Sequence, residues 1–165
     1  MRFDVIIGNP PYHKRDGGSG VSSKPLYHYF ILTAIKIHPK YICMIIPSRW
    51  FSGGRGLDKF REKMLKDKRF VEIHDFMNAA DCFPGVEIKG GVNYFLWSSS
   101  YRGKCKIITY ENGIKESESL RDLDEFNFLV RYNQAISMIK KVQSKNLHSF
   151  MNIVMSAKPF GFRTF

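Results

Sequence analysis

Two short apolar runs, each ended by proline, constrain the fold of this chain more than any other feature of its sequence. Residues 3–8 read Phe-Asp-Val-Ile-Ile-Gly and lead into Asn9 and two prolines, and residues 41–46 read Tyr-Ile-Cys-Met-Ile-Ile and lead into Pro47. A short run of this kind, rich in β-branched residues, is typical of a strand buried on both faces in a parallel sheet that helices cover. We therefore predict an α/β domain with two central strands.

Two amphipathic helices are expected next to the second run. Residues 26–37 carry apolar side chains at helical spacing and stop at a His-Pro pair, and residues 57–67 place apolar side chains inward with Lys and Arg outward. The side chains expected to face the core are Leu26, Phe30, Ala34 and Ile37 in the first helix and Leu57, Phe60, Met64 and Leu65 in the second. Residues 13–24 are polar and glycine-rich and are predicted to form a mobile loop.

The second half of the chain changes its pattern. Residues 71–76, 91–97 and 106–110 are predicted strands, and residues 126–141 a further helix that covers a face of the sheet. Strands alternate with helices early and then follow one another. This order predicts parallel strands first and then an antiparallel strand or a small β extension.

Composition and charge limit the class of protein and its partners. The chain has 165 residues, 44% of them hydrophobic and 25% charged, which is typical of one soluble globular domain and excludes collagenous and largely disordered chains. The 26 Lys and Arg against 15 Asp and Glu give a net charge of +11, which favours an acidic partner, most often nucleic acid. Charge alone does not exclude an anionic membrane.

The positive charge is concentrated in two blocks. Residues 36–70 hold ten basic and three acidic residues, residues 131–165 hold six basic and no acidic residues, and residues 111–130 have a net charge of −4. A solvated helix face explains the first block as well as a phosphate-binding surface does. The charge pattern therefore supports a nucleic-acid partner without establishing one.

Targeting and metal-binding patterns point to an intracellular protein without a metal. The sequence has no apolar run of membrane-spanning length and no signal-peptide pattern at its start, so we predict a cytoplasmic location and no membrane partner. Cys43, Cys82 and Cys105 are odd in number and far apart, which excludes a disulfide framework and a CxxC zinc site. The five histidines show no ligand spacing, so no metal is predicted.

The segment Asn9-Pro10-Pro11-Tyr12 carries the most specific chemistry. It directly follows a predicted strand, at the carboxyl end where open α/β sheets bind ligands. The prolines remove two backbone donors and hold Pro10 extended, so that its carbonyl can point outward as an acceptor. The Asn9 side-chain oxygen is a second acceptor, and Tyr12 offers an aromatic face. Two acceptors beside an aromatic ring suit a planar ring with an exocyclic amine.

An adenine N6 amine fits this arrangement. Each of its N–H groups can donate to one acceptor while the ring stacks on the tyrosine. Holding both hydrogens out of the ring plane favours a pyramidal nitrogen whose lone pair faces an incoming methyl group. In duplex DNA the base would have to flip out of the stack.

Residues 3–12 closely resemble the catalytic motif of amino-group DNA methyltransferases that make N6-methyladenine, especially the gamma class of restriction–modification systems. The resemblance continues through Leu26-Tyr27, the Pro-Ser loop after residue 46, and the loop Cys82-Phe83-Pro84 before a strand that is antiparallel in the family. It covers about residues 1–110. It implies a DNA partner, S-adenosylmethionine as cofactor and a partial Rossmann-like sheet.

The resemblance implies roles for single residues. Asn9 and the Pro10 carbonyl, within the motif that also holds Pro11, would bind the target amine, and Tyr12 would stack on the flipped base. Phe83 would be the second aromatic wall, or it anchors its loop in the core; Tyr94 is the alternative wall. The predicted cofactor contacts are Asn9, Leu26 and Tyr27. The predicted phosphate contacts are Lys14, Arg15, Arg49 and Arg55; the alternative for Lys14 and Arg15 is a solvated loop.

The same resemblance implies that parts of the catalytic domain are missing. The family's glycine-rich cofactor turn precedes the motif, and we interpret the glycines at residues 17–20 and 53–56 as flexible loops instead. We expect residues 1–110 to be the C-terminal half of the catalytic domain, residues 111–150 a β and helical extension, and residues 151–165 the start of a truncated target-recognition region. The missing half or another chain would complete the sheet, or exposed edges would self-associate.

The leading hypothesis is a fragment of an adenine-specific DNA methyltransferase. We expect the isolated chain to transfer methyl groups poorly or not at all, and Asn9→Ala to abolish transfer in the complete enzyme. One alternative is an N-methyltransferase that acts on RNA or a protein amide. Another is a non-catalytic nucleic-acid-binding domain with a residual pocket.

Overall fold

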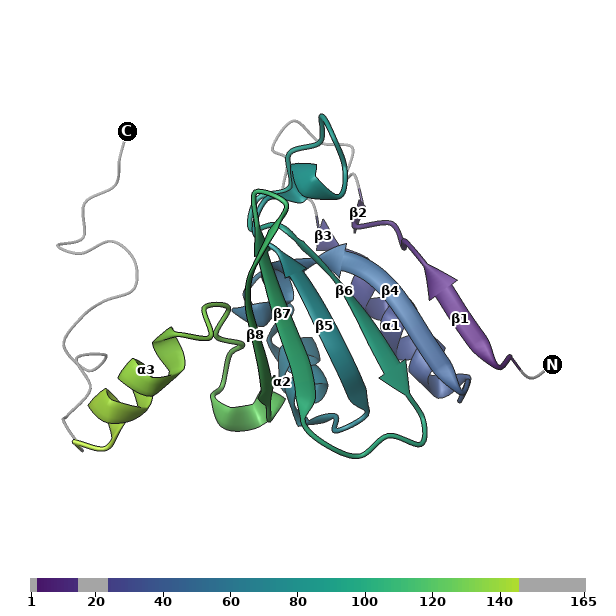
Figure 1. The fold of residues 1–165 in the computed structure, drawn as a ribbon. Helices are drawn as coiled ribbons and strands as arrows, with labels where there is room; N and C mark the ends of the chain where they lie inside the picture. Colours follow the sequence, from purple (N-terminus) through teal and green to yellow (C-terminus); the bar gives the residue numbers. More distant parts are fainter. Residues whose placement is uncertain (1–2, 15–23, 146–165) are drawn as a thin grey trace, which may run out of the picture. The chain divides into compact units, whose positions relative to one another are not determined.

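A six-stranded mixed sheet forms the centre of the protein in the computed structural model, which describes residues 3–14 and 24–145 (Figure 1). The strand order is β1-β4-β6-β5-β7-β8. The bounds of these strands are β1 Val5–Gly8, β4 Tyr41–Pro47, β5 Phe70–Phe76, β6 Val92–Ser98, β7 Cys105–Glu111 and β8 Ile114–Arg121. The chain forms two compact units that meet in sequence between Asn133 and Gln134, and the sheet belongs to the first.

The pairing of the strands confirms the predicted class. β1 pairs with β4 and β5 with β7 in parallel, whereas β6 runs antiparallel to both β4 and β5. Val92, the first residue of β6, lies opposite both Pro47 at the end of β4 and Phe76 at the end of β5. The carboxyl ends of the parallel strands and the start of β6 therefore lie at the same end of the sheet.

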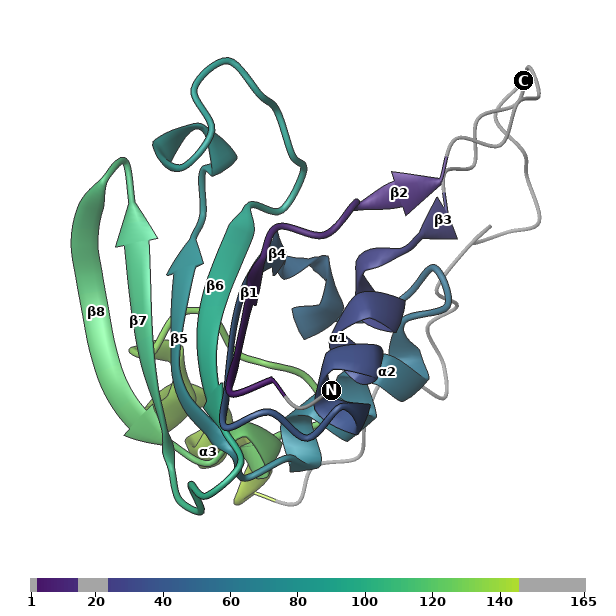
Figure 2. The ribbon, with the colours of Figure 1, turned by 90° about the vertical axis from the view of Figure 1, so that its right-hand side faces the viewer.

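Two helices cover one face of the sheet. Helix α1 (Tyr27–Lys36) and helix α2 (Asp58–Lys66) lie on the same side in Figure 2. Short 3-10 turns at Ser48–Phe51, Ala79–Asp81 and Leu123–Glu125 connect the other elements. The four side chains predicted to point inward from α2 and the turn before it are all buried, and the core also includes Trp50, Phe70, Phe95 and Trp97.

Strand β1 is not buried on both faces, so that part of the prediction was wrong. Val5 is 50% exposed and Ile7 77% exposed, because β1 is the outermost strand and pairs only with β4 within the described residues. Helix α1 is also turned from the predicted face: Ile31 and Ile35 are buried, whereas Phe30 and Ile37 remain exposed. An apolar surface therefore lies along both elements.

The segment after β7 differs most from expectation. Strand β8 was not predicted, because its sequence is polar. The predicted helix over residues 126–141 is observed only as α3 (Ala135–Gln143), in the second unit. Residues before it are held out of a helix by long-range hydrogen bonds: the Leu129 amide donates to the Phe51 carbonyl over 2.9 Å, and the Thr109 hydroxyl donates to the Arg131 carbonyl over 3.0 Å.

The glycine-rich segment after the motif is partly described. Its two ends pair as short antiparallel strands, β2 (His13–Lys14) and β3 (Lys24–Pro25), where a loop was predicted. Residues 15–23, with the predicted phosphate contact Arg15, lie outside the described residues, as do residues 146–165 and the predicted start of a recognition region. None of the described helices has the length and apolar character needed to cross a membrane.

Candidate functional site

The Asn-Pro-Pro-Tyr segment leaves the carboxyl end of β1 and is fixed at both of its ends. Parallel pairing of Gly8 with Met44 holds its start, and the Leu26 amide donates to the Tyr12 carbonyl over 2.9 Å at the beginning of α1. Pro10 is buried, whereas Asn9 and Pro11 are exposed. The segment is thus anchored to the sheet and to the helix, with Asn9 at the surface.

Two hydrogen-bond acceptors in this segment are free. No described residue donates to the Asn9 side chain or to the Pro10 carbonyl. Proline lacks an N–H, so the segment cannot use these acceptors through its own backbone at Pro10 or Pro11. The pair can therefore accept hydrogen bonds from a ligand that carries an amine or amide N–H₂ group.

Tyr12 stands next to these acceptors in a half-buried position. Its ring packs edge-on against Tyr27, with centroids 6.5 Å apart and planes at 82°, and its hydroxyl is buried without a hydrogen-bond partner within the described residues. Burial, with a smaller contribution from Cys82, raises the pKa of Tyr12 to about 12. Tyr12 is therefore neutral at physiological pH and can stack on an uncharged aromatic ring.

The predicted Phe83 loop runs from the end of β5 to the start of β6, so it lies at the same end of the sheet as the motif. Phe83 is half-buried, its amide donates to the Ala79 carbonyl over 2.9 Å, and it is not part of the buried core. No ring contact joins it to Tyr12 among the described residues. Tyr94, the alternative wall, stacks on His74 with centroids 4.4 Å apart.

Basic side chains act on the residue that follows this segment, His13. Burial lowers the pKa of His13, and the charges of Arg55 and Arg49 lower it further. The structure thus brings two of the predicted phosphate contacts near the end of the motif. Lys14 is exposed on β2.

A buried polar network, which we did not predict from the sequence, lies at the same end of the sheet as the motif. Asp75 is 1% exposed and accepts hydrogen bonds from the Ser48 hydroxyl (2.7 Å) and from the Arg131 guanidinium (2.6 and 2.8 Å). Asn93 donates to the Ser48 hydroxyl over 3.2 Å. Burial raises the pKa of Asp75, although Arg131 and Ser48 oppose that rise. The only sequence signals were an aspartate inside an apolar strand and a serine after Pro47.

The network also fixes the end of the Phe83 loop. Arg131 donates to the Gly90 carbonyl over 2.7 Å. Gly91 has a φ of +77°, and a side chain there would place its Cβ 2.0 Å from the Phe76 carbonyl oxygen. Only glycine fits this approach, so the return of the loop into β6 is set by backbone geometry.

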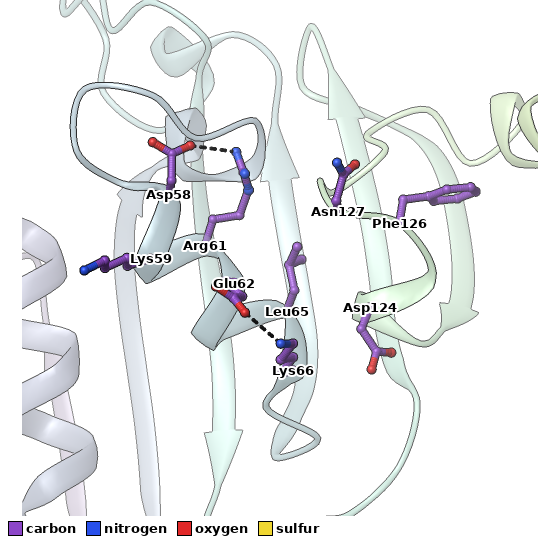
Figure 3. Close-up of a pocket in the computed structure, with 9 residues that line it drawn as sticks. All are labelled: Asp58, Lys59, Arg61, Glu62, Leu65, Lys66, Asp124, Phe126 and Asn127. Atoms are coloured by element: carbon purple, nitrogen blue, oxygen red, sulfur yellow. Dashed lines mark hydrogen bonds and ion pairs between the residues drawn. The ribbon is translucent and has the colours of Figure 1, made fainter. Parts of the chain in front are cut away.

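Two of the cavities that do not include motif residues lie beside the helices. The larger, about 520 Å³, lies between α2 and residues 124–127 (Figure 3). Four of its charged side chains form two ion pairs: Asp58 with Arg61 at 3.2 Å, and Glu62 with Lys66 at 2.7 Å. The other, about 360 Å³ and almost entirely apolar, lies between α1 and strands β1 and β4. In the part of the chain that the structure describes, no three His, Cys, Asp or Glu side chains form a metal-binding group.

Comparisons with known proteins agree with the resemblance carried by the motif. Residues 1–83, half of the chain, match the family of the Eco57I restriction-modification methylase. A protein of Mycoplasma pneumoniae (strain ATCC 29342 / M129 / Subtype 1), described as an uncharacterized adenine-specific methylase, is 45% identical over 112 residues, which cover 66% of this chain and 26% of that protein. The chain thus spans about a quarter of the length of this curated relative.

Solved structures of restriction–modification proteins are also similar. A type I restriction–modification complex contains a chain with a TM-score of 0.49 and 15% identity, matched over 87% of this chain and 30% of its own length. The methyltransferase subunit of a type I system from Streptococcus thermophilus has a TM-score of 0.45 and 12% identity, over 90% of this chain and 33% of its own length.

Proposed function

The chain belongs to the Eco57I restriction-modification methylase family, and from that premise we propose that it is the target-base-binding part of an adenine-specific DNA methyltransferase. The observation that carries this proposal is the pair of free acceptors, the Asn9 amide and the Pro10 carbonyl, next to the neutral ring of Tyr12. They fit an extruded adenine: each acceptor takes one N–H of the N6 amine, and Tyr12 stacks on the ring.

These contacts also explain how the amine becomes reactive. The lone pair of the adenine amine is delocalised into the ring, so the amine is a poor nucleophile in its planar form. Acceptors that hold both N–H groups out of the ring plane favour a pyramidal nitrogen, and this preference grows in the transition state of methyl transfer. The chain therefore contributes orientation and electrostatic stabilisation, and Phe83 is proposed as the second wall of the pocket.

Part of a site for S-adenosylmethionine fits the end of β1. Asn9 is exposed there with its amide free, and Leu26 is half-buried beside the carbonyl of Tyr12. We propose that these two residues contact the cofactor, which supplies an electrophilic methyl group when bound. Tyr27 is only 1% exposed, so its proposed contribution is to support Tyr12 through their edge-on packing.

The rest of the cofactor site is proposed to lie on polypeptide that pairs with the open edge of β1. Ile7 is 77% exposed on that strand, and the apolar cavity between α1 and β1 is lined by Phe30, Ile37 and Met44 among others. A parallel strand with such a surface is normally covered. We therefore keep the expectation that the 165-residue chain alone transfers labelled methyl groups from S-adenosylmethionine to DNA poorly or not at all; robust transfer would contradict it.

Stacking on Tyr12 can be tested with the chain itself. The probe is a short DNA duplex with 2-aminopurine opposite an abasic site, because a base without a pairing partner costs less to flip out of the stack. Binding is expected to quench its fluorescence. Tyr12→Ala is expected to prevent quenching and to weaken binding about 5- to 150-fold, equivalent to about 1–3 kcal/mol for one base stacked on an aromatic ring.

The matched control is Tyr132→Ala, which removes a 52% exposed tyrosine. It is expected to leave both the quenching and the affinity unchanged. Equal behaviour of the two variants would contradict the proposed pocket and would favour a nucleic-acid-binding domain without a base site.

A further inference from the structure

Arg49 differs from the other sheltered arginines because its side chain pairs with none of the residues that the structure describes. Five arginines of the described residues are buried or half-buried. Four of them donate to a carboxylate or a carbonyl: Arg61, Arg69, Arg121 and Arg131. The Arg49 guanidinium makes no hydrogen bond or ion pair with any described residue, and its Nε is fully buried. A partly buried guanidinium that has no hydrogen-bond partner lowers the stability of the fold unless an anion binds it.

A cleft of about 310 Å³ provides the space for such an anion. It lies at the carboxyl ends of the parallel strands, and Arg49, Lys89 and Arg131 line it together with Phe51 and Gly90. Lys89 is exposed and has no ion pair with a described residue. No acidic residue lines the cleft. Two positive charges are therefore available in it, in addition to Arg131.

The charge of Arg131 in the cleft is already neutralised by an ion pair. Arg131 forms a two-point ion pair with the buried Asp75, and its guanidinium also lies over the ring of Phe51, 5.8 Å from the centroid. The Ser48 hydroxyl holds the same carboxylate. Arg131 is thus committed to the protein, which leaves Arg49 and Lys89 as the groups that can bind a ligand.

The cleft adjoins the proposed adenine pocket through Arg49. The charge of Arg49 acts on both His13 and Tyr27, and Tyr27 packs edge-on against Tyr12. A base that enters the Tyr12 pocket leaves its sugar and phosphates at the rim. The rim on the Arg49 side is this cationic cleft.

We propose that Arg49 and Lys89 together bind one phosphodiester of the DNA strand that carries the extruded adenine. The inference rests on the proposed function and names the contact that holds the strand while the base is in the pocket. The guanidinium presents a planar fork that suits two phosphate oxygens, and the ammonium acts as a point charge from the opposite side.

The salt dependence of DNA binding tests this contact. The probe is a short duplex with adenine opposite an abasic site, and its affinity for the full 165-residue chain is measured by fluorescence anisotropy across a series of KCl concentrations. Each phosphate contact contributes about 0.9 to the slope of log K against log salt. The double variant Arg49→Gln/Lys89→Gln is expected to lower this slope by about 1, and Arg49→Lys to retain it.

The control removes two positive charges from the other end of the sheet, away from the carboxyl ends of the parallel strands. Lys36 ends α1, and Arg102 lies in the loop between β6 and β7. Lys36→Gln/Arg102→Gln is expected to leave the slope unchanged, with unfolding midpoints confirming that both double variants fold. An equal fall for both double variants, or no fall for Arg49→Gln/Lys89→Gln, would overturn the proposal.

Two further measurements separate the alternatives. Inorganic phosphate at constant ionic strength is expected not to compete with the duplex; competition at millimolar concentration would overturn the assignment to a phosphodiester. Tyr12→Ala is expected to weaken binding of the extrahelical base while the slope stays the same. If Tyr12→Ala has no effect but the slope still falls in the Arg49/Lys89 variant, the phosphate contact is supported and the adenine pocket is refuted.

Discussion

The two edges of the sheet are built differently. Strand β8 closes one edge with the sequence Ile-Lys-Glu-Ser-Glu-Ser-Leu-Arg, in which charged and hydroxyl side chains predominate. Strand β1 closes the other edge with Val-Ile-Ile-Gly, and Ile7 is 77% exposed. Charged side chains on an edge strand prevent further pairing, whereas a bare apolar edge invites it. β8 therefore has the features of a true edge, and β1 those of an interior strand.

The same contrast extends to the carboxyl ends of the strands. At β5 and β6, Asp75 and Asn93 are buried and are hydrogen-bonded to other residues of the network. At β1, the Asn9 side chain and the Pro10 carbonyl bond to no described residue. Polar groups that are paired within the protein stabilise the fold, and those left free are available to a ligand. These free groups are the basis for our proposal that the ligand binds at the carboxyl end of β1.

The largest difference between the two ends should be in stability. Phe95→Ala in β6 removes a side chain that is 1% exposed and is expected to lower the free energy of unfolding by about 3–5 kcal/mol. Ile7→Ala in β1 is expected to lower it by less than about 0.5 kcal/mol, as for other surface positions. Urea denaturation measures both. A loss at Ile7 as large as that at Phe95 would show that the chain already covers β1.

A smaller effect should follow from Asp67, which joins α2 to β5. Its side chain is buried, which opposes ionisation, but hydrogen bonds from Arg69 and the Trp97 indole lower its pKa overall. A carboxylate with a lowered pKa stabilises the fold above its unfolded pKa, and this stabilisation is lost as the pH falls through the folded value. Asp67→Asn should therefore cost about 1.5–3 kcal/mol near pH 7 and progressively less below about pH 4.

The control for Asp67 is Asp4, which forms an exposed ion pair with Lys40 just before β1. Both side chains of that pair are 67% exposed, so Asp4→Asn should change stability by less than about 1 kcal/mol at any pH. Chemical denaturation at a series of pH values distinguishes the two. A pH-independent loss for Asp67→Asn would contradict the ionic role of its carboxylate.

The smallest effect on stability should come from a pair of matched edge variants. Ile7 in β1 and Ile114 in β8 are both highly exposed, at 77% and 71%. Lysine at either position should change the free energy of unfolding by less than about 0.5 kcal/mol. Sedimentation velocity should show that Ile7→Lys, and not Ile114→Lys, reduces concentration-dependent association of the chain. Equal effects of the two variants would remove the distinction between the edges.

The parts of the fold predicted correctly are those whose side chains pack locally in a regular pattern. The bounds of β4, β5 and β6 and the buried face of α2 follow from apolar periodicity alone. The sequence of β1 indicated a buried strand because its residues suit an interior position, yet no described strand covers it. β8 was missed because an edge strand with Lys115 and Glu118 has no apolar signal.

Long-range contacts account for the other failures. The helical pattern after residue 126 is overridden by the hydrogen bond from Leu129 to Phe51 and by the ion pair of Arg131 with Asp75, residues 78 and 56 positions away in sequence. The motif itself could be placed from its sequence, because its position after a strand is a local property. That Arg49 pairs with none of the described residues could not be predicted, since it depends on where their carboxylates lie.

The proposed pocket depends on the acceptors at the end of β1 binding the amine of an extruded adenine. The most direct test compares two duplexes with an abasic site, one carrying adenine opposite it and the other carrying purine, which lacks the amine. Each hydrogen bond contributes about 0.5–1.5 kcal/mol, so the chain should bind the adenine duplex roughly tenfold more tightly than the purine duplex. Asn9→Ala should remove about half of this difference in binding free energy. The control Asn127→Ala should leave it unchanged. Equal affinity of the unaltered chain for adenine and purine would contradict the claim.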